Sequence, residues 1–258
     1  MFYFIIGAFV GSFLNVCIHR LPRRESISFP PSHCPECQHR LNVFDLIPIF
    51  GYFLLLGRCR YCSKNISFRY PLVEFVTAIL FMAVSYYFPV SSSPLEFYFY
   101  LIFCCGMVVL FFIDLEQQVV PDVVSIPGIL LGVVFNYLRE AINPAQKTFI
   151  PALFGLFLGY SLLFVIAWAG KICFKKEAVG EGDLYLIAIL GAYLGWRGML
   201  LSLFMAYLIA GISIIVLLIL RKVKMGQYVP FGPALASAAI IALFYGEPIM
   251  RWYFNLFY

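Results

Sequence analysis

Two cysteine pairs with the same internal spacing stand in the first quarter of the chain. They are Cys34-Pro-Glu-Cys37 and Cys59-Arg-Tyr-Cys62, with twenty-one residues between them. Two such pairs can place four thiolates around one ion at about 2.3 Å, as a structural Zn²⁺ site requires. The same cysteines could instead form two disulfides, and a reducing compartment would disfavour that alternative.

Three aspartates stand at the ends of apolar runs and are the candidates for acid chemistry. Asp114 and Asp122 each follow an apolar run, and Asp183 lies between Gly182 and Leu184, where the next run begins. Ionisable groups at membrane depth are costly and are functional hypotheses by default. Two carboxylates that meet in a low dielectric do not easily both carry a charge, so they would share a proton. One could then deprotonate a water while the other polarises a peptide carbonyl, as in an aspartic protease.

Each aspartate also has a simpler interpretation. Asp122 and Asp183 stand where helix N-caps stand, and Asp114 could end a helix at the lipid headgroups. Carboxylates at a membrane boundary could also bind a cation or relay a proton in a transporter or channel. Residue types and spacing leave capping, paired catalysis and transport open.

The composition indicates the environment that must hold these groups. Of 258 residues, 63% are hydrophobic, 19% are aromatic and only 12% are charged. These values lie far from those of water-soluble domains and exclude disordered, fibrous and nucleic-acid-binding proteins. We therefore expect an all-α polytopic membrane protein embedded in a lipid bilayer.

About eight apolar runs could cross the bilayer, since a span needs roughly 20 apolar residues. The first, residues 2–18, is followed by His19 and Arg20 and by no cleavage site, so we interpret it as a retained span. The others are expected at about 71–89, 97–113, 123–138, 151–170, 184–196, 198–220 and 233–246. The runs at 184–196 and 233–246 are short, and Pro127 and Gly128 interrupt the run at 123–138.

The predicted organisation has three parts. Residues 1–19 form the first transmembrane helix, and residues 20–70 form one long loop that carries the two cysteine pairs. Residues 71–258 form a seven-helix membrane domain that carries the aspartates. A loop this short has little core of its own, so a closed Cys₄ metal site would fold it and would not take part in catalysis.

Basic residues predict the orientation, because cytoplasmic loops carry an excess of Lys and Arg. With eight spans and the N-terminus outside, fourteen of the eighteen basic residues fall on the cytoplasmic side. We therefore expect both termini outside and the cysteine loop in the reducing cytoplasm, which favours zinc over disulfides. Asp114, Asp122 and Asp183 then all lie at the cytoplasmic boundary. The net charge of +5 is explained by this asymmetry and needs no nucleic acid.

The sequence resembles the type IV prepilin peptidases, which are G-x-G-D membrane aspartic proteases. Gly180-Glu181-Gly182-Asp183 matches the G-x-G-D pattern, and the two cysteine pairs stand in the expected order before it. Further similar blocks are residues 11–22, 66–74, 113–114, 120–122 and 230–234. The family usually has Lys where this chain has Tyr185.

The resemblance implies a bifunctional enzyme of the bacterial inner membrane. It would cleave the basic leader from type IV prepilin or pseudopilin precursors and then N-methylate the new N-terminus, with S-adenosylmethionine as the methyl donor. Asp114 and Asp183 would be the catalytic aspartates, and the four cysteines would belong to the cytoplasmic domain. The charge asymmetry independently puts both aspartates at the boundary where such a precursor would be cut. The alternative is a transporter or channel whose carboxylates bind a cation.

Overall fold

The computed structural model describes residues 1–174, 180–224 and 229–255. Among these residues every regular element is a helix, and the only β-type pairing is two isolated bridges. Within these described ranges, seven helices are long and apolar enough to cross a membrane. They are α1 (Phe2–Arg20), α3 (Arg69–Tyr87), α4 (Pro94–Gln117), α5 (Asp122–Ile142), α6 (Phe149–Phe174), α7 (Glu181–Ile219) and α8 (Gly232–Asn255). The predicted all-helical membrane class is confirmed.

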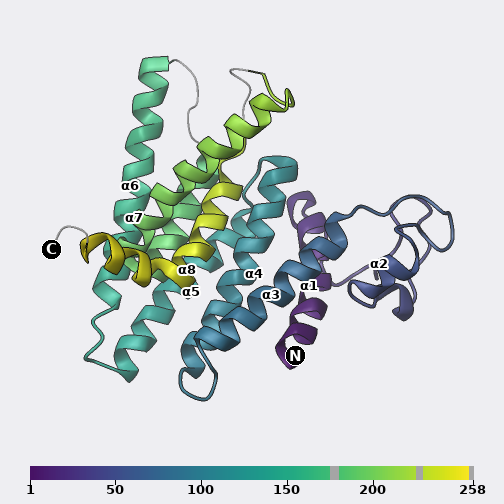
Figure 1. The fold of residues 1–258 in the computed structure, drawn as a ribbon, viewed down its shortest axis with the longest axis horizontal. Helices are drawn as coiled ribbons and strands as arrows, with labels where there is room; N and C mark the ends of the chain where they lie inside the picture. Colours follow the sequence, from purple (N-terminus) through teal and green to yellow (C-terminus); the bar gives the residue numbers. More distant parts are fainter. Residues whose placement is uncertain (175–179, 225–228, 256–258) are drawn as a thin grey trace. The chain divides into compact units, whose positions relative to one another are not determined.

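The chain divides into two compact units, Met1–Val109 and Leu110–Tyr258, with the division inside α4. In the first unit α1 packs closely on α3 (Figure 1). Glycines make this contact possible: a Cβ added to Gly7 would lie 2.7 Å from Ala78 Cα, and one added to Gly11 would lie 2.6 Å from Glu74 Cα. Small residues four apart on one face therefore let the two backbones approach.

The loop between α1 and α3 contains only short helices. These are η1 (Leu21–Arg23), η2 (Val43–Leu46) and α2 (Phe50–Leu54). The loop is tied to the end of α1, because the buried Arg20 guanidinium donates hydrogen bonds to Ser26 O at 2.9 Å and Pro30 O at 2.7 Å. Charge-assisted bonds of this kind are roughly twice as strong as neutral ones.

In the second unit α5, α6 and α8 all pack against α7. The 39 residues of α7 do not form one straight helix, because Gly195 has φ 69° and ψ 177°. This left-handed φ suits glycine and separates α7 into two arms. Ile187 on the first arm and Met199 on the second both contact Gly159 of α6, so the second arm folds back beside the first. The bend lies where the sequence predicted the end of one run and the start of the next.

Two other predicted spans differ from those observed. The expected interruption at Pro127 does not occur, because α5 is continuous and loses only the bond that the missing N–H would make. The last helix runs to Asn255, beyond the predicted end at 246, and it continues through Pro248. In both helices the hydrogen bonds and packing of the surrounding residues stabilise the helix more than one proline destabilises it.

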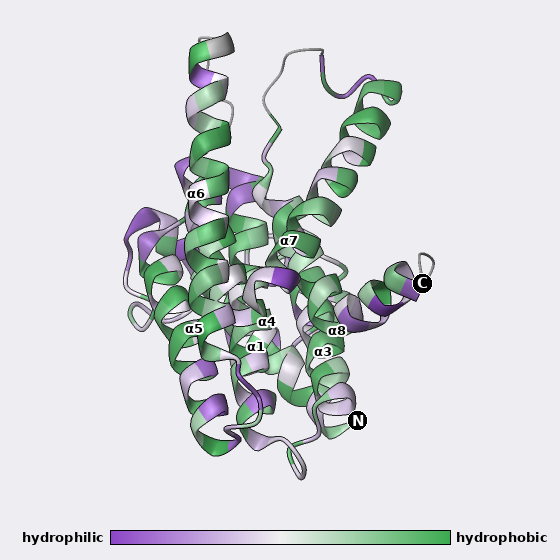
Figure 2. Cartoon of the chain, turned by 90° about the vertical axis from the view of Figure 1, so that its left-hand side faces the viewer, coloured by the Kyte–Doolittle hydropathy of each residue, from purple (hydrophilic) through white to green (hydrophobic). Residues whose placement is uncertain are grey.

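The polar groups of the second unit gather at the ends of its helices. Figure 2 shows the bodies of α6 and α7 mainly in the hydrophobic colour, with hydrophilic residues toward helix ends and loops. The bend at Gly195 lies near the start of α6, where Gly155 contacts Trp196. The end of α4 and the starts of α7 and α8 meet at another place, where Gly232 contacts Asp114 and Gly182 contacts Val120.

Candidate active site and metal site

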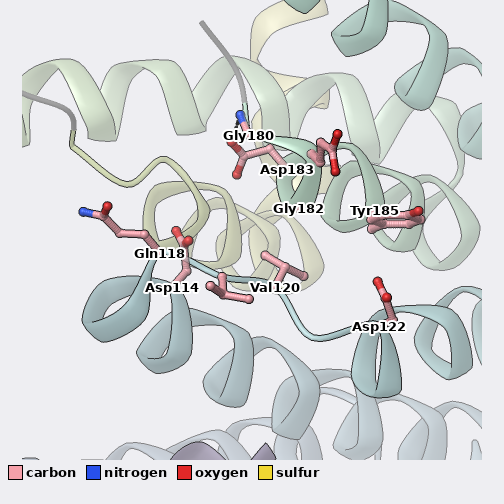
Figure 3. Close-up of a pocket in the computed structure, with 10 residues that line it drawn as sticks. Asp114, Gln118, Val120, Asp122, Gly180, Gly182, Asp183 and Tyr185 are labelled. Atoms are coloured by element: carbon pink, nitrogen blue, oxygen red, sulfur yellow. Dashed lines mark hydrogen bonds between the residues drawn. The ribbon is translucent and has the colours of Figure 1, made fainter. Parts of the chain in front are cut away.

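One pocket of about 250 Å³ opens where the end of α4 and the starts of α5 and α7 meet. Figure 3 shows Asp114 and Asp183 entering it from α4 and α7, with Asp122 at the start of α5. All three predicted boundary aspartates therefore line one space. The structure describes ten lining residues: Asp114, Gln118, Val119, Val120, Asp122, Gly180, Glu181, Gly182, Asp183 and Tyr185.

Asp114 lies within the last turn of α4 and is only 5% exposed. Its Oδ2 atom is buried, makes no regular hydrogen bond among the described residues, and lies against the backbone of Gly232, which interacts with the carboxyl group. A carboxylate that merely ended a helix at the headgroups would be hydrated, so the burial of Asp114 disfavours that interpretation. A buried carboxyl group with so few partners is costly to keep, and such groups are typical of functional sites.

Asp183 is the third residue of α7 and is also 5% exposed. Its Oδ2 accepts a hydrogen bond from the Gly180 N–H at 3.3 Å, and its own N–H donates to Gly180 O at 3.1 Å. The capping interaction expected as the simple alternative is therefore present. It also fixes the carboxyl group at the helix start, facing the pocket, so capping and catalysis are compatible at this residue.

Two glycines let the elements that carry the aspartates come together. A Cβ on Gly232 would lie 2.5 Å from Asp114 Oδ2, so only glycine lets the α8 backbone touch that carboxyl group. A Cβ on Gly182 would collide with the Val120 side chain, in the segment between α4 and α5. The charges of Asp114 and Asp183 are close enough to interact.

Two further acids line the pocket at more exposed positions. Asp122 and Glu181 are exposed, whereas Asp114 and Asp183 are buried. No Lys or Arg stands among the ten described lining residues. Asp122 is the first residue of α5 and Pro121 stands at the N-cap position, so Asp122 is an acid of the first turn and not the N-cap. The pocket thus combines a buried acid pair with an acidic, solvent-facing side.

Sequence reasoning missed two polar residues near the pair. Gln118 lines the pocket one helical turn after Asp114, and that spacing could have indicated it. Tyr207, on the second arm of α7, lies within electrostatic range of Asp183 and packs on Phe231 with ring centroids 5.1 Å apart. No sequence spacing indicates this residue, because only the bend at Gly195 brings it back.

The four predicted metal ligands lie together in the first unit. The Sγ atoms of Cys34, Cys37, Cys59 and Cys62 are all within 4.8 Å of one another, and Cys34 Sγ lies 3.9 Å from Cys62 Sγ. Four sulfurs placed tetrahedrally at about 2.3 Å from one ion are about 3.8 Å apart, whereas a disulfide would need about 2.05 Å. The cluster therefore fits one metal ion, and the disulfide alternative is not what the structure shows.

The two cysteine pairs have the same backbone geometry. Cys34 N–H donates to His39 O at 3.0 Å, and Cys59 N–H donates to Lys64 O at 2.8 Å. A left-handed residue follows the second cysteine of each pair, namely Gln38 and Ser63, both with φ 58°. Backbone N–H groups of Cys62 and Tyr61 lower the pKa of the Cys59 thiol to about 7, which favours the thiolate that a metal binds.

Comparison with known proteins places the chain in a family. The model of the Bacterial Peptidase A24 N-terminal domain matches residues 5–88, and that of the Type IV leader peptidase family matches residues 101–216. A prepilin leader peptidase/N-methyltransferase of Aeromonas hydrophila is 36% identical over 98% of this chain and 93% of its own length. The enzyme of the same name from Pseudomonas aeruginosa is 34% identical over 96% and 91%.

Other relatives agree, although the match to one of them is shorter. A relative of the same name from Myxococcus xanthus is 39% identical over 78% of this chain and 57% of its own length. No solved structure matches the chain. The N-terminal domain model covers the cysteine loop. The leader peptidase model covers both pocket aspartates, Asp114 and Asp183. The chain therefore belongs to the type IV prepilin leader peptidase family.

Proposed function

We propose that this protein cleaves the basic leader from type IV prepilin or pseudopilin precursors, with Asp114 and Asp183 as the catalytic pair. The observation that carries the proposal is that these two buried carboxyl groups, from two different helices, line one pocket. Relatives that match nearly the whole chain are also named prepilin leader peptidase/N-methyltransferase. A transporter would equally place acids in a membrane, but the relatives' names favour the peptidase.

The carboxyl pair acts on water and on the scissile peptide in turn. In the form that holds one proton, the ionised carboxylate takes a proton from water as the water oxygen attacks the carbonyl carbon. The protonated carboxyl group donates a hydrogen bond to the carbonyl oxygen and stabilises the negative charge that develops there. The proton then passes to the departing nitrogen, the C–N bond breaks, and the pair returns to its starting state.

The acidic side of the pocket suits a cationic leader. Asp122 and Glu181 add two exposed carboxylates to the buried pair, and the described lining residues contribute no positive charge. Opposite charges at a partly exposed site contribute modest affinity but orient the substrate. A leader with Lys or Arg before the cleavage point would therefore bind with its basic residues toward Asp122 and Glu181.

The orientation of the protein in the inner membrane is part of the proposal. We assign the pocket and the cysteine loop, residues 20–70, to the cytoplasmic side of the membrane. Both termini are assigned to the outside. The described basic residues at the pocket end of the second unit, Arg221, Lys222 and Lys224, support this assignment. Residues 71–258 then form the membrane domain that carries the protease site.

The cysteine cluster is assigned to structural Zn²⁺. Its four thiolates would fill a tetrahedral coordination sphere, so the ion would hold the loop together and leave no position for substrate. The two short bridges and matching turns around the pairs support this role, because the loop has few other regular elements.

Methyl transfer is the second proposed activity. The names of the relatives support it. The new N-terminal amine would take a methyl group from the sulfonium of S-adenosylmethionine, releasing S-adenosylhomocysteine and a proton.

Mass spectrometry of the product tests both activities. Purified protein in lipid is mixed with a prepilin-like precursor, with and without S-adenosylmethionine. Loss of the leader, followed by the gain of one methyl group only when the donor is present, is the expected result. Cleavage without methylation would restrict the proposal to the peptidase. Absence of cleavage of several precursors by well-folded protein would reject it and favour a transporter.

A further inference from the structure

An uncharged apolar segment lies inside the otherwise polar cysteine loop. Residues 46–57 contain no Asp, Glu, Lys or Arg. Five large apolar side chains in and around this segment are between 58% and 85% exposed. We call them the α2 patch: Phe44, Phe50, Phe53, Leu54 and Leu56. Twelve residues are too few to cross a bilayer, and an apolar segment of this length is either buried in a core or lies in the membrane interface. The exposure of these side chains favours the interface.

The three patch residues within α2 belong to one side of that helix. Phe50, Phe53 and Leu54 are three and four residues apart, so they share a helix face. Gly51, on another face, is buried against Asp45 O, 2.8 Å from where a Cβ would stand. The loop thus packs its small residue inward and leaves its large apolar residues uncovered within the first unit, and Figure 1 shows α2 set off to one side of α1 and α3.

A buried carboxylate of α3 fixes the depth of this segment. Glu74 Oε2 accepts a hydrogen bond from the Ile49 N–H at 2.7 Å, directly before α2. Ile49 has φ 65°, a strained value for a β-branched residue, so the contact holds the backbone in an unusual conformation. Glu74 is the sixth residue of α3, about 7.5 Å along the helix axis from Arg69 at 1.5 Å per residue. Segments that lie in the membrane interface are buried about 5–10 Å.

The charges around the patch match a lipid surface. Arg40, Arg58, Arg60 and Lys64 of the loop are exposed, and Asp45, the acid next to Phe44, pairs with Arg60 at 2.8 Å. Basic residues that flank an apolar segment favour anionic headgroups by about 1 kcal/mol each near the surface.

We propose that the α2 patch inserts into the headgroup region of the bilayer and anchors the cysteine loop flat on the membrane. The inference depends on α1 and α3 crossing the membrane, and it is independent of the proposed catalytic activity. Because the loop leaves the bilayer at the end of α1 and returns at the start of α3, it cannot move far from that surface. The anchor would hold the metal-bearing loop beside the membrane at a constant height.

Photo-crosslinking of the full-length protein tests this anchor. p-Benzoylphenylalanine replaces Phe53 or Phe50, and Tyr61 in the second cysteine pair serves as the matched aromatic control outside the patch. The proteins are placed in nanodiscs of phosphatidylcholine, with or without phosphatidylglycerol, irradiated and digested for mass spectrometry. We expect lipid adducts at positions 50 and 53, several-fold more than at position 61, and more with the anionic lipid.

Other products would overturn the inference. Crosslinks from positions 50 and 53 to peptides of residues 110–255 would show that the second unit covers the patch. Crosslinks to an added prepilin-like precursor would show that the patch binds substrate. Equal lipid labelling at positions 53 and 61 would show general proximity to the bilayer without a specific anchor. Using two patch positions keeps the test valid if one substitution prevents folding.

Discussion

At the scale of single residues, the site depends on how four carboxylates differ in burial. Asp114 and Asp183 are each 5% exposed, whereas Asp122 and Glu181 are exposed on the same pocket. Chemistry that shares a proton needs the buried pair, since low dielectric strengthens their interaction. Recognition of a basic leader needs only nearby negative charge. The two roles can therefore be separated by substitution.

Asp122→Asn and Glu181→Gln should weaken substrate binding and leave the chemical step nearly intact. Each removes one partly solvated charge, worth roughly 0.5–1 kcal/mol, so KM for a basic-leader precursor should rise about two- to fivefold with kcat little changed. Initial rates measured against precursor concentration provide the check, with Tyr185→Phe as a control that keeps the charge of the pocket. A fall in kcat comparable to that of the Asp114 variant would contradict the division of roles.

At the scale of helices, close glycine contacts bring the acid-bearing ends together. Gly232 touches Asp114 and Gly182 touches Val120, so both positions exclude a side chain. By contrast, a Cβ on Gly211, in the second arm of α7, would meet nothing within 4 Å. The chain therefore offers its own control for the effect of an added methyl group.

Gly232→Ala should lower cleavage although it changes no charge. The methyl group would stand 2.5 Å from Asp114 Oδ2 and displace the carboxyl group, and a shift of about 1 Å can cost on the order of a hundredfold in rate. Gly211→Ala should leave the rate unchanged and raise stability by roughly 0.5–1 kcal/mol, because alanine is the better helix former. Cleavage assays and thermal unfolding of both variants test this, and equal activities would refute the proposed contact.

The cysteine loop should depend on its metal. Purified protein is expected to contain one zinc per chain, and Cys34→Ser should lose most of it because the cluster has no spare ligand. Without metal the backbone of residues 21–68 should exchange hydrogen faster, as measured by mass spectrometry. Cys105→Ala, outside the cluster, should keep its zinc. Full zinc content in the Cys34→Ser protein would rule out the four-cysteine site.

At the scale of the whole molecule, the proposed eight crossings require that the two arms of α7 cross the membrane separately. The pocket lies at the start of α5 and the loop of residues 143–148 follows its end, so the proposal assigns them to opposite sides of the membrane. In the proposed orientation, which is based on the excess of basic residues, the pocket end faces the inside of the cell.

Reporter fusions test this topology. An enzyme that is active only outside the cytoplasm should be active when fused after Gln146 or Ser92 and inactive when fused after Lys224. The reverse pattern, or activity at all three points, would contradict both the orientation and the count of crossings.

Much of this arrangement could be predicted from the sequence, for identifiable reasons. Apolar runs report bilayer crossings directly, and the spacing of Cys34, Cys37, Cys59 and Cys62 reports their cluster, because local turns bring each pair together. The fold-back at Gly195 was predicted only as two neighbouring runs, residues 184–196 and 198–220.

Long-range contacts were less predictable. The nearness of Tyr207 to Asp183 depends on the angle of that bend, and the contact of Gly232 with Asp114 depends on packing between distant segments. The hydrogen bond from Ile49 to Glu74 could not be predicted from the sequence either, because no spacing rule links two residues 25 apart in a loop and a helix.

The most direct test of the central claim is the cleavage rate of Asp114→Asn, Asp183→Asn and the double variant, measured on one precursor in lipid. If the two carboxyl groups act as a pair, each single variant should lose about 10²–10⁴-fold or more, and the double variant should be no slower than the slower single one. All three should keep the unfolding temperature and zinc content of the parent protein. Substantial cleavage by either folded single variant would contradict the account.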